Sequence, residues 1–220
     1  MLFVEIAREQ TQEIANAVNA FGHYLHDLAA WDLILQSLTE DQRFEVVFEF
    51  LLPTSVYCLC APYAIKGRLH TSIAEVSHQA NRFRLSGWKD NANLAKPNFM
   101  TARQHACDWT SWPALEVALS QLSGDKFTNT SDDFRNRFNH GYPRRIEFGL
   151  TGFVQRNVTS DDSVSYNLGS SSPLRIADLI PLLAEQHAAA LSCYNAYIEL
   201  VKEQHAQLPA NPTVNTDAGR

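Results

Sequence analysis

The sequence lacks the features that several common protein classes require. Its cysteines, Cys58, Cys60, Cys107 and Cys193, include no pair with the two-residue spacer of a metal knuckle or redox motif. It has no His-Glu-x-x-His sequence and no glycine-rich phosphate loop, so zinc-protease and P-loop interpretations are unsupported. No run approaches the roughly 18 apolar residues of a membrane span, and Glu5 stands where a signal peptide needs a basic start. We therefore expect buried, reduced cysteines in a cytoplasmic protein with no membrane partner and no metal site.

The chain also has little positive charge to offer a polyanion. With 18 basic and 24 acidic residues its net charge is −6, so any site for nucleic acid must be local. An apolar content of 45% and a charged content of 19% are typical of a folded globular protein. We expect a single domain over residues 1–206, with an insertion at 145–170 and a disordered polar tail at 207–220.

Apolar residues that recur every three or four positions predict a mainly α fold. The predicted helices cover residues 5–38, 44–51, 63–84, 101–108, 113–122 and 179–205. Pro53 is expected to end or kink the second helix, because proline lacks an amide donor and clashes with the preceding turn. Asp178 is a candidate N-cap for the last helix, which places Pro181 in its first turn.

A small β-hairpin is predicted near residues 145–168. Residues 146–151 and 164–168 alternate apolar and polar side chains, and Asp161-Asp162 provides a turn between them. This hairpin would be an insertion on the helical body.

The segment from Asp132 to Arg145, DDFRNRFNHGYPRR, concentrates polar and aromatic side chains between two helix signals. Thr130 and Asp133 have the spacing of a capping box, and Gly141 is a typical helix stop. These signals predict a helix over residues 131–140. Phe134 and Phe138 would share its buried face.

Within that helix Arg135 and His140 would point about 140° apart, because successive residues turn by about 100°. Asn136 lies one helical turn before His140. One helix therefore does not aim Arg135 and His140 at a common point without a loosened last turn or a second subunit.

Arg135, followed directly by Asn136 and after three more residues by His140, resembles the signature of HEPN domains. The His140-Gly141-Tyr142 sequence further resembles HEPN toxins paired with minimal nucleotidyltransferases, which adenylylate that tyrosine. The resemblance implies a HEPN-like antiparallel helical bundle. It also implies a metal-independent endoribonuclease without a cofactor, acting as a homodimer whose two motifs face each other. For the toxin subgroup it implies an antitoxin or nucleotidyltransferase partner.

The residues also suit RNA cleavage on their own terms. Histidine is the side-chain type best suited to proton transfer, so His140 would be the acid/base group, while the forked guanidinium of Arg135 would hold the phosphate. Asn136 would orient the imidazole or bind an RNA oxygen. The further candidates for RNA binding or modification are Arg137, Arg144, Arg145 and Tyr142.

Structural explanations compete with these roles. His140 suits a helix C-terminus electrostatically, and Arg144-Arg145 has the character of a solvated charge run. The sequence also leaves open a non-catalytic HEPN-like scaffold or sensor that binds RNA or a nucleotide. A di-iron site is disfavoured, because Glu75-x-x-His78 is the one motif of its kind and such sites need two.

Overall fold

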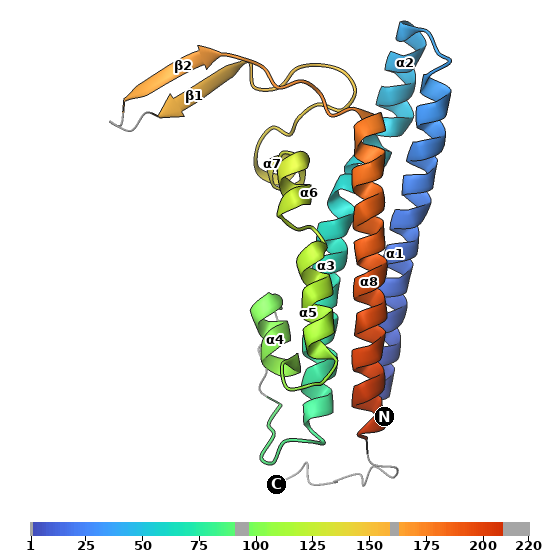
Figure 1. The fold of residues 1–220 in the computed structure, drawn as a ribbon, viewed down its shortest axis with the longest axis vertical. Helices are drawn as coiled ribbons and strands as arrows, with labels where there is room; N and C mark the ends of the chain where they lie inside the picture. Colours follow the sequence, from blue (N-terminus) through green and yellow to red (C-terminus); the bar gives the residue numbers. More distant parts are fainter. Residues whose placement is uncertain (1, 91–96, 159–162, 209–220) are drawn as a thin grey trace, which may run out of the picture. The chain divides into compact units, whose positions relative to one another are not determined.

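A computed structural model describes residues 2–90, 97–158 and 163–208. Its elements are α1 (Leu2–Leu35), α2 (Glu40–Val46), a π-helical turn η1 (Val47–Leu51), α3 (Leu52–Asn81), α4 (Phe99–Ala106), α5 (Trp112–Gln121), α6 (Asp125–Thr130), α7 (Phe134–His140), β1 (Val154–Val158), β2 (Val164–Leu168) and α8 (Ile176–Ala206) (Figure 1). The mainly α fold with a small antiparallel hairpin is therefore confirmed. The expected first strand at residues 146–151 is wrong, because the strand that pairs with β2 is β1, which begins at Val154. The expected turn at Asp161-Asp162 and the tail from residue 209 onward lie outside the described residues.

The chain divides into two compact units. The first comprises Met1–Val18, Ala64–Leu122 and Ala189–Arg220, and the second comprises Asn19–Tyr63 and Ser123–Ala188. Helices α1, α3 and α8 each contribute one segment to each unit. The single domain expected from the sequence stays a prediction, and each unit is described by itself.

Prolines do not interrupt the long helices where the sequence suggested. Helical structure is continuous through Pro53. The five residues of η1, which ends two positions before Pro53, adopt π-helical geometry, which widens the helix locally. Pro62 lies inside α3, so the expected helix start after it is wrong. Pro181 lies inside α8, because that helix begins earlier than expected, at Ile176, and Asp178 is in its first turn instead of capping it.

The stretch Glu40–Asn81 is long and apolar enough to cross a membrane by length and composition alone. A core helix of a soluble protein meets the same criterion. Leu59, Leu69 and Ile73 in this stretch are fully buried, so the structure is compatible with a soluble protein.

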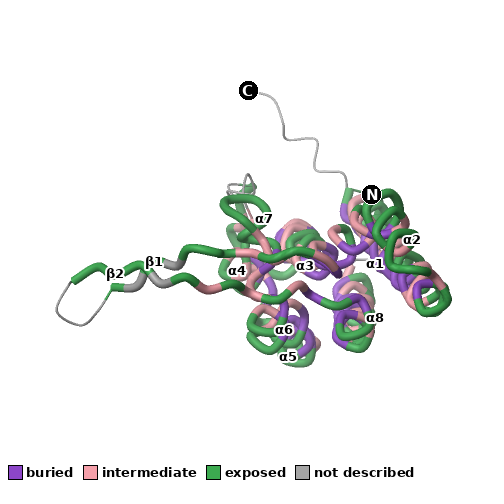
Figure 2. Tube along the Cα trace, turned by 90° about the horizontal axis from the view of Figure 1, so that it is seen from above, coloured by how far each residue is buried: buried purple, intermediate pink, exposed green. Residues whose placement is uncertain are grey.

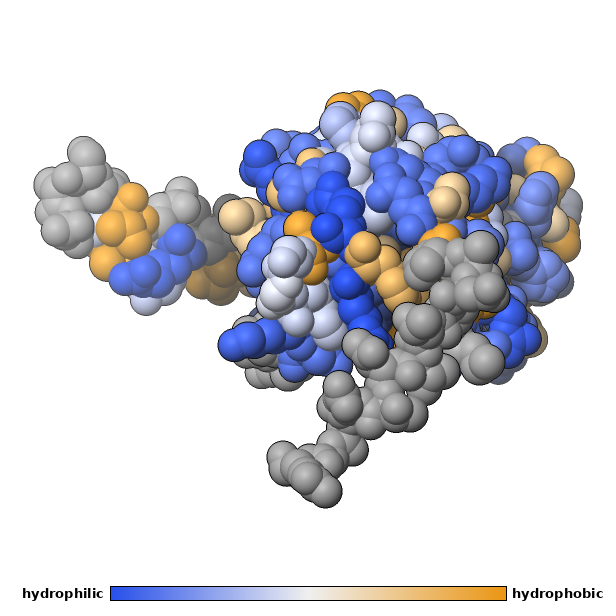
Figure 3. All heavy atoms as spheres, turned by 90° about the horizontal axis from the view of Figure 1, so that it is seen from below, coloured by the Kyte–Doolittle hydropathy of each residue, from blue (hydrophilic) through white to orange (hydrophobic). Residues whose placement is uncertain are grey.

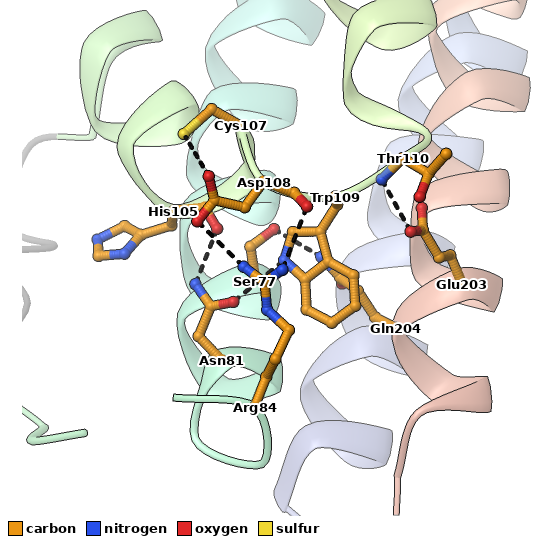
Figure 4. A network of polar contacts seen from close by, with 10 residues as sticks. All are labelled: Ser77, Asn81, Arg84, His105, Cys107, Asp108, Trp109, Thr110, Glu203 and Gln204. Atoms are coloured by element: carbon orange, nitrogen blue, oxygen red, sulfur yellow. Dashed lines mark hydrogen bonds and ion pairs between the residues drawn. The ribbon is translucent and has the colours of Figure 1, made fainter. Parts of the chain in front are cut away.

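A buried polar network ties α3 to the segment between α4 and α5 in the first unit. Asn81, 5% exposed, donates from Nδ2 to the His105 carbonyl oxygen (2.8 Å) and accepts from Trp109 Nε1 (3.1 Å) at its Oδ1 (Figure 4). The Glu203 carboxylate of α8 accepts hydrogen bonds from the amides of Thr110 and Ser111, both at 2.8 Å. These contacts satisfy donors that the start of α5 leaves without intrahelical partners.

Replacing Asn81 tests the value of this network. Asn81→Leu keeps a similar volume but leaves the buried Trp109 Nε1 without an acceptor, so we expect the free energy of unfolding to fall by about 1–2 kcal/mol. Urea denaturation measures the change. The exposed Gln121→Leu is the control, and an equal effect of the two substitutions would contradict the role of Asn81.

His70 makes the first unit sensitive to acid. Its Nε2 is buried without a hydrogen bond within the described residues. Burial, and then the charge of Lys66, lower the pKa of His70 from 6.5 to about 4. The unfolded chain therefore binds a proton that the folded chain rejects, and stability should be lost as pH falls from about 6.5 to about 4. We expect His70→Phe to flatten this part of the stability profile, measured as urea midpoints across that window; an unchanged slope would contradict the assignment.

Candidate active site

The motif helix α7 begins later than the sequence indicated. Asp132 and Asp133 adopt the left-handed region, with φ of 56° and 48°, so α6 ends at Thr130 and α7 starts at Phe134. Aspartate tolerates this conformation better than most residues. The predicted helix start at Ser131 and the capping box with Asp133 are therefore wrong. The predicted end is confirmed, because the Gly141 amide donates to the Arg137 carbonyl oxygen (2.8 Å) and the helix stops at His140.

The two phenylalanines of α7 differ in burial. Phe134 is 2% exposed and anchors the helix, whereas Phe138 stacks on it at 5.9 Å between ring centroids and is 48% exposed. The expectation that both are buried holds for Phe134 alone. Phe138 instead lines an open groove.

Arg135 and His140 present free side chains on α7. Both are exposed, and within the described residues neither side chain forms a hydrogen bond or ion pair. Arg135 lies close enough to α3 to act on Cys60 and Tyr63. Burial raises the pKa of both groups, and the Arg135 charge partly opposes that rise. The charge of Arg135 therefore acts on α3, while its donors remain available.

Asn136 forms a hydrogen bond at the start of its own helix. Its Nδ2 donates to Asp133 Oδ2 at 3.0 Å. The expected contact between Asn136 and the His140 imidazole is not present, because the left-handed turn before α7 places the Asp133 carboxylate within reach of the amide. Asn136 therefore stabilises the beginning of the motif helix.

The structure does not bring Arg135 and His140 together within one chain. Both lie in the regular helix α7, where five residues of separation turn the side chains about 140° apart. His140 and Asn136 lie on the side of α7 opposite Phe134 and Phe138. The divergence expected from the sequence is thus retained.

Among the remaining candidate residues, Arg137 and Arg144 form polar contacts within the chain, whereas Arg145 and Tyr142 are exposed. Arg137 forms an ion pair with Asp132 (3.0 Å), and Arg144 donates from Nε and Nη2 to the Ser172 carbonyl oxygen at 2.9 and 2.6 Å. Arg145, by contrast, is exposed, and its guanidinium has no ion pair in the described part of the chain. Tyr142 is 87% exposed.

Sequence reasoning missed Cys60 and Tyr63 as neighbours of Arg135. The Tyr63 hydroxyl and Thr128 Oγ1 are hydrogen-bonded at 3.0 Å, which links α3 to α6 just before the motif. The available signal was their spacing of three residues, which places them on one helical face. It was hidden because the third helix was expected to begin only at Tyr63.

Other candidate metal ligands have structural roles. Glu75 accepts a hydrogen bond from Gln10 (2.7 Å), and His78 bonds Asp90 (3.0 Å). No group of three or more His, Cys, Asp or Glu residues suited to holding a metal ion occurs among residues 2–90, 97–158 and 163–208. Of the four cysteines expected to be buried, Cys58 and Cys193 are buried, Cys60 is half-buried and Cys107 is exposed.

Comparison with protein-family models, curated proteins and solved structures finds no match to this chain. The resemblance to HEPN domains therefore depends on the motif from Arg135 to Tyr142 and on the helical setting of that motif. The exposed side chains of Arg135 and His140 on α7 are the other observation that bears on the function.

Proposed function

We propose that this protein is a metal-independent endoribonuclease of HEPN type. The observation that carries the proposal is the pairing of two unengaged, exposed side chains, Arg135 and His140, at the spacing of the motif on one short helix. Arg137 and Arg144 differ from Arg135, because each of them is bound to an acceptor within the chain. Arg135 and His140 are left for a ligand.

The proposed reaction is a transfer within the RNA backbone. The neutral imidazole of His140 takes the proton of the 2′-hydroxyl, whose oxygen then attacks the adjacent phosphorus. The bond from phosphorus to the 5′-oxygen breaks, and that oxygen takes the proton from the imidazolium formed at His140. The products are a 2′,3′-cyclic phosphate and a 5′-hydroxyl. Arg135 donates to the non-bridging phosphate oxygens, where negative charge develops.

Two chains are proposed to form one site. A single α7 cannot direct Arg135 and His140 at the same phosphate, because their side chains diverge by about 140°. A second copy related by a twofold axis would bring its Arg135 to the His140 of the first chain. The proposed enzyme is therefore a homodimer.

The outer part of the site is proposed to come from Tyr142 and Arg145, whose side chains are exposed. Arg145 would bind RNA phosphate, and Tyr142 would stack on a base or serve as the site at which a nucleotidyltransferase partner restrains a toxin. Arg144 would act indirectly, by fixing the segment through Ser172. A cytoplasmic location is part of this proposal.

The test is an assay of the purified protein on single-stranded RNA in excess EDTA. We expect fragments that end in a 2′,3′-cyclic phosphate and begin with a 5′-hydroxyl, because the attacking oxygen belongs to the substrate. Fragments with 3′-hydroxyl ends, or activity that EDTA removes, would contradict the mechanism. RNA binding without cleavage at stoichiometric protein would favour the HEPN-like scaffold or sensor instead.

A further inference from the structure

The β-hairpin has one largely apolar face that no described residue of its unit covers. Its register pairs Val154 with Leu168 and Val158 with Val164, and these four side chains share a face because side chains alternate along a strand. Tyr166 and Arg156, which pair with each other, lie on the same face, so one charged side chain stands among five apolar ones. All five side chains are between 45% and 77% exposed.

This exposure is costly for an isolated hairpin. A two-stranded hairpin in water is at best marginally stable without a third strand or a packing surface. Figure 2 shows the strand residues that it colours by burial as exposed, and Figure 3 shows hydrophobic side chains open to solvent on the hairpin at the left of the view. We therefore expect another protein surface to pack against this apolar face.

The same unit also has an uncovered apolar groove. It encloses about 380 Å³ and lies between the α2 to α3 segment, α7 and the chain leading to the hairpin. Three rings on its walls, Phe44, Phe48 and Phe138, are 52%, 48% and 48% exposed. Phe44 also contacts Phe148 at 5.9 Å. Because Phe138 is on the opposite side of α7 from His140, filling this groove leaves His140 open.

We propose that the hairpin is a dimerisation arm whose apolar face docks in the Phe-lined groove of a second copy, with the exchange made reciprocally. With about 200 Å² for a fully exposed aromatic side chain and less for valine and leucine, the five apolar side chains of the arm and the three rings of the groove together offer roughly 800 Å² of apolar surface per protomer. A stable protein complex needs about 800 Å² per partner.

Reciprocal exchange buries both the apolar face of the arm and the Phe-lined groove, whereas arm-to-arm packing buries only the arm. Packing of one arm against the partner's arm would cover roughly 500 Å² per chain and leave the three phenylalanine rings in water. An exchange also closes under twofold symmetry, since each chain gives one arm and one groove. The inference concerns assembly and does not depend on RNA cleavage.

The first experiment compares two substitutions that add the same charge to adjacent positions of β2. Tyr166→Asp places a carboxylate on the apolar face, whereas Ser165→Asp places it on the opposite face. Light scattering after size exclusion should report a dimer for the wild type and Ser165→Asp, and at least a tenfold weaker dimer for Tyr166→Asp. A monomeric wild type, or equal dimerisation of the two variants, would overturn the proposal.

The second experiment identifies the docking partner of the arm. In a Cys107→Ser background, protein with Tyr166→Cys is mixed with differently tagged protein carrying Phe48→Cys, and the mixture is oxidised. We expect disulfides that join the two tags, with Phe44→Cys as a second groove position in case Phe48→Cys folds poorly. Linkage of Tyr166→Cys chains only to one another would show arm-to-arm packing and overturn the proposal, as would the absence of any cross-link from either groove position.

Discussion

His140→Ala should reduce RNA cleavage by about 10²- to 10⁴-fold, the usual contribution of a positioned acid/base group. The side chain is exposed and makes no hydrogen bond or ion pair among the described residues, so the substitution should leave thermal stability nearly unchanged. A loss of activity without a loss of stability is what separates catalysis from a structural role. Asn139→Ala, at an exposed neighbouring position of α7, is the matched control and should retain wild-type rates.

The next prediction concerns Arg135, which is proposed to bind the phosphate. Arg135→Ala should lower the rate by about 10²- to 10³-fold, because it removes charge stabilisation from the transition state. Arg135→Lys keeps the charge but not the two-pronged donor geometry, so its rate should lie between those of the wild type and Arg135→Ala. Single-turnover cleavage measures all three. Wild-type rates in either alanine variant, at Arg135 or at His140, would remove that residue from the mechanism.

Glu147→Ala should destabilise the second unit by about 2–3 kcal/mol, the largest stability effect we expect. Glu147 is 7% exposed, and its carboxylate accepts from the Ile176 amide (3.0 Å) and from Arg175 Nη1 (2.9 Å). Removing it leaves an amide at the first residue of α8 buried without an acceptor, and removes a negative charge from the N-terminus of that helix. The Glu147 amide, which donates to the Leu174 carbonyl oxygen (2.8 Å), also fixes the base of the hairpin.

Urea denaturation and hydrogen exchange at the Ile176 amide measure this effect. Glu185→Ala, which removes an exposed ion pair with Lys126 in the same unit, is the control and should cost under about 1 kcal/mol. Glu147→Gln should cost less than Glu147→Ala, because its amide oxygen can still accept one hydrogen bond. Equal stability of the Ala variants at positions 147 and 185 would contradict the capping role of Glu147.

Hydrophobic periodicity predicted the long helices and much of their buried faces. Ile14, Val18 and Phe21 are buried as expected, because spacing along a helix is a local property. The positions of the prolines were less informative. Whether a helix continues through a proline such as Pro62 depends on packing that the local sequence does not contain. The six-residue helix α6 was missed, since so short an element has almost no periodic signal.

At the candidate site, the sequence predicted the exposed helix end but not the partners of its side chains. The acceptor of Arg144 is the carbonyl oxygen of Ser172, 28 residues away, and carbonyl positions have no signature in the sequence. The left-handed turn at Asp132 and Asp133 redirects Asn136 and shortens the helix. Such backbone reversals are rare outside glycine, so composition favours a continued helix.

Arg135 and His140 are proposed to form one site contributed by two chains, and mixing two inactive variants tests this most directly. Arg135→Ala and His140→Ala protein would be unfolded together, refolded as a mixture and assayed on RNA in EDTA. We expect the mixture to regain a substantial fraction of wild-type activity, because mixed dimers bring an intact Arg135 from one chain to an intact His140 from the other. A mixture no more active than its separate components, although mixed dimers are present, would contradict the shared site.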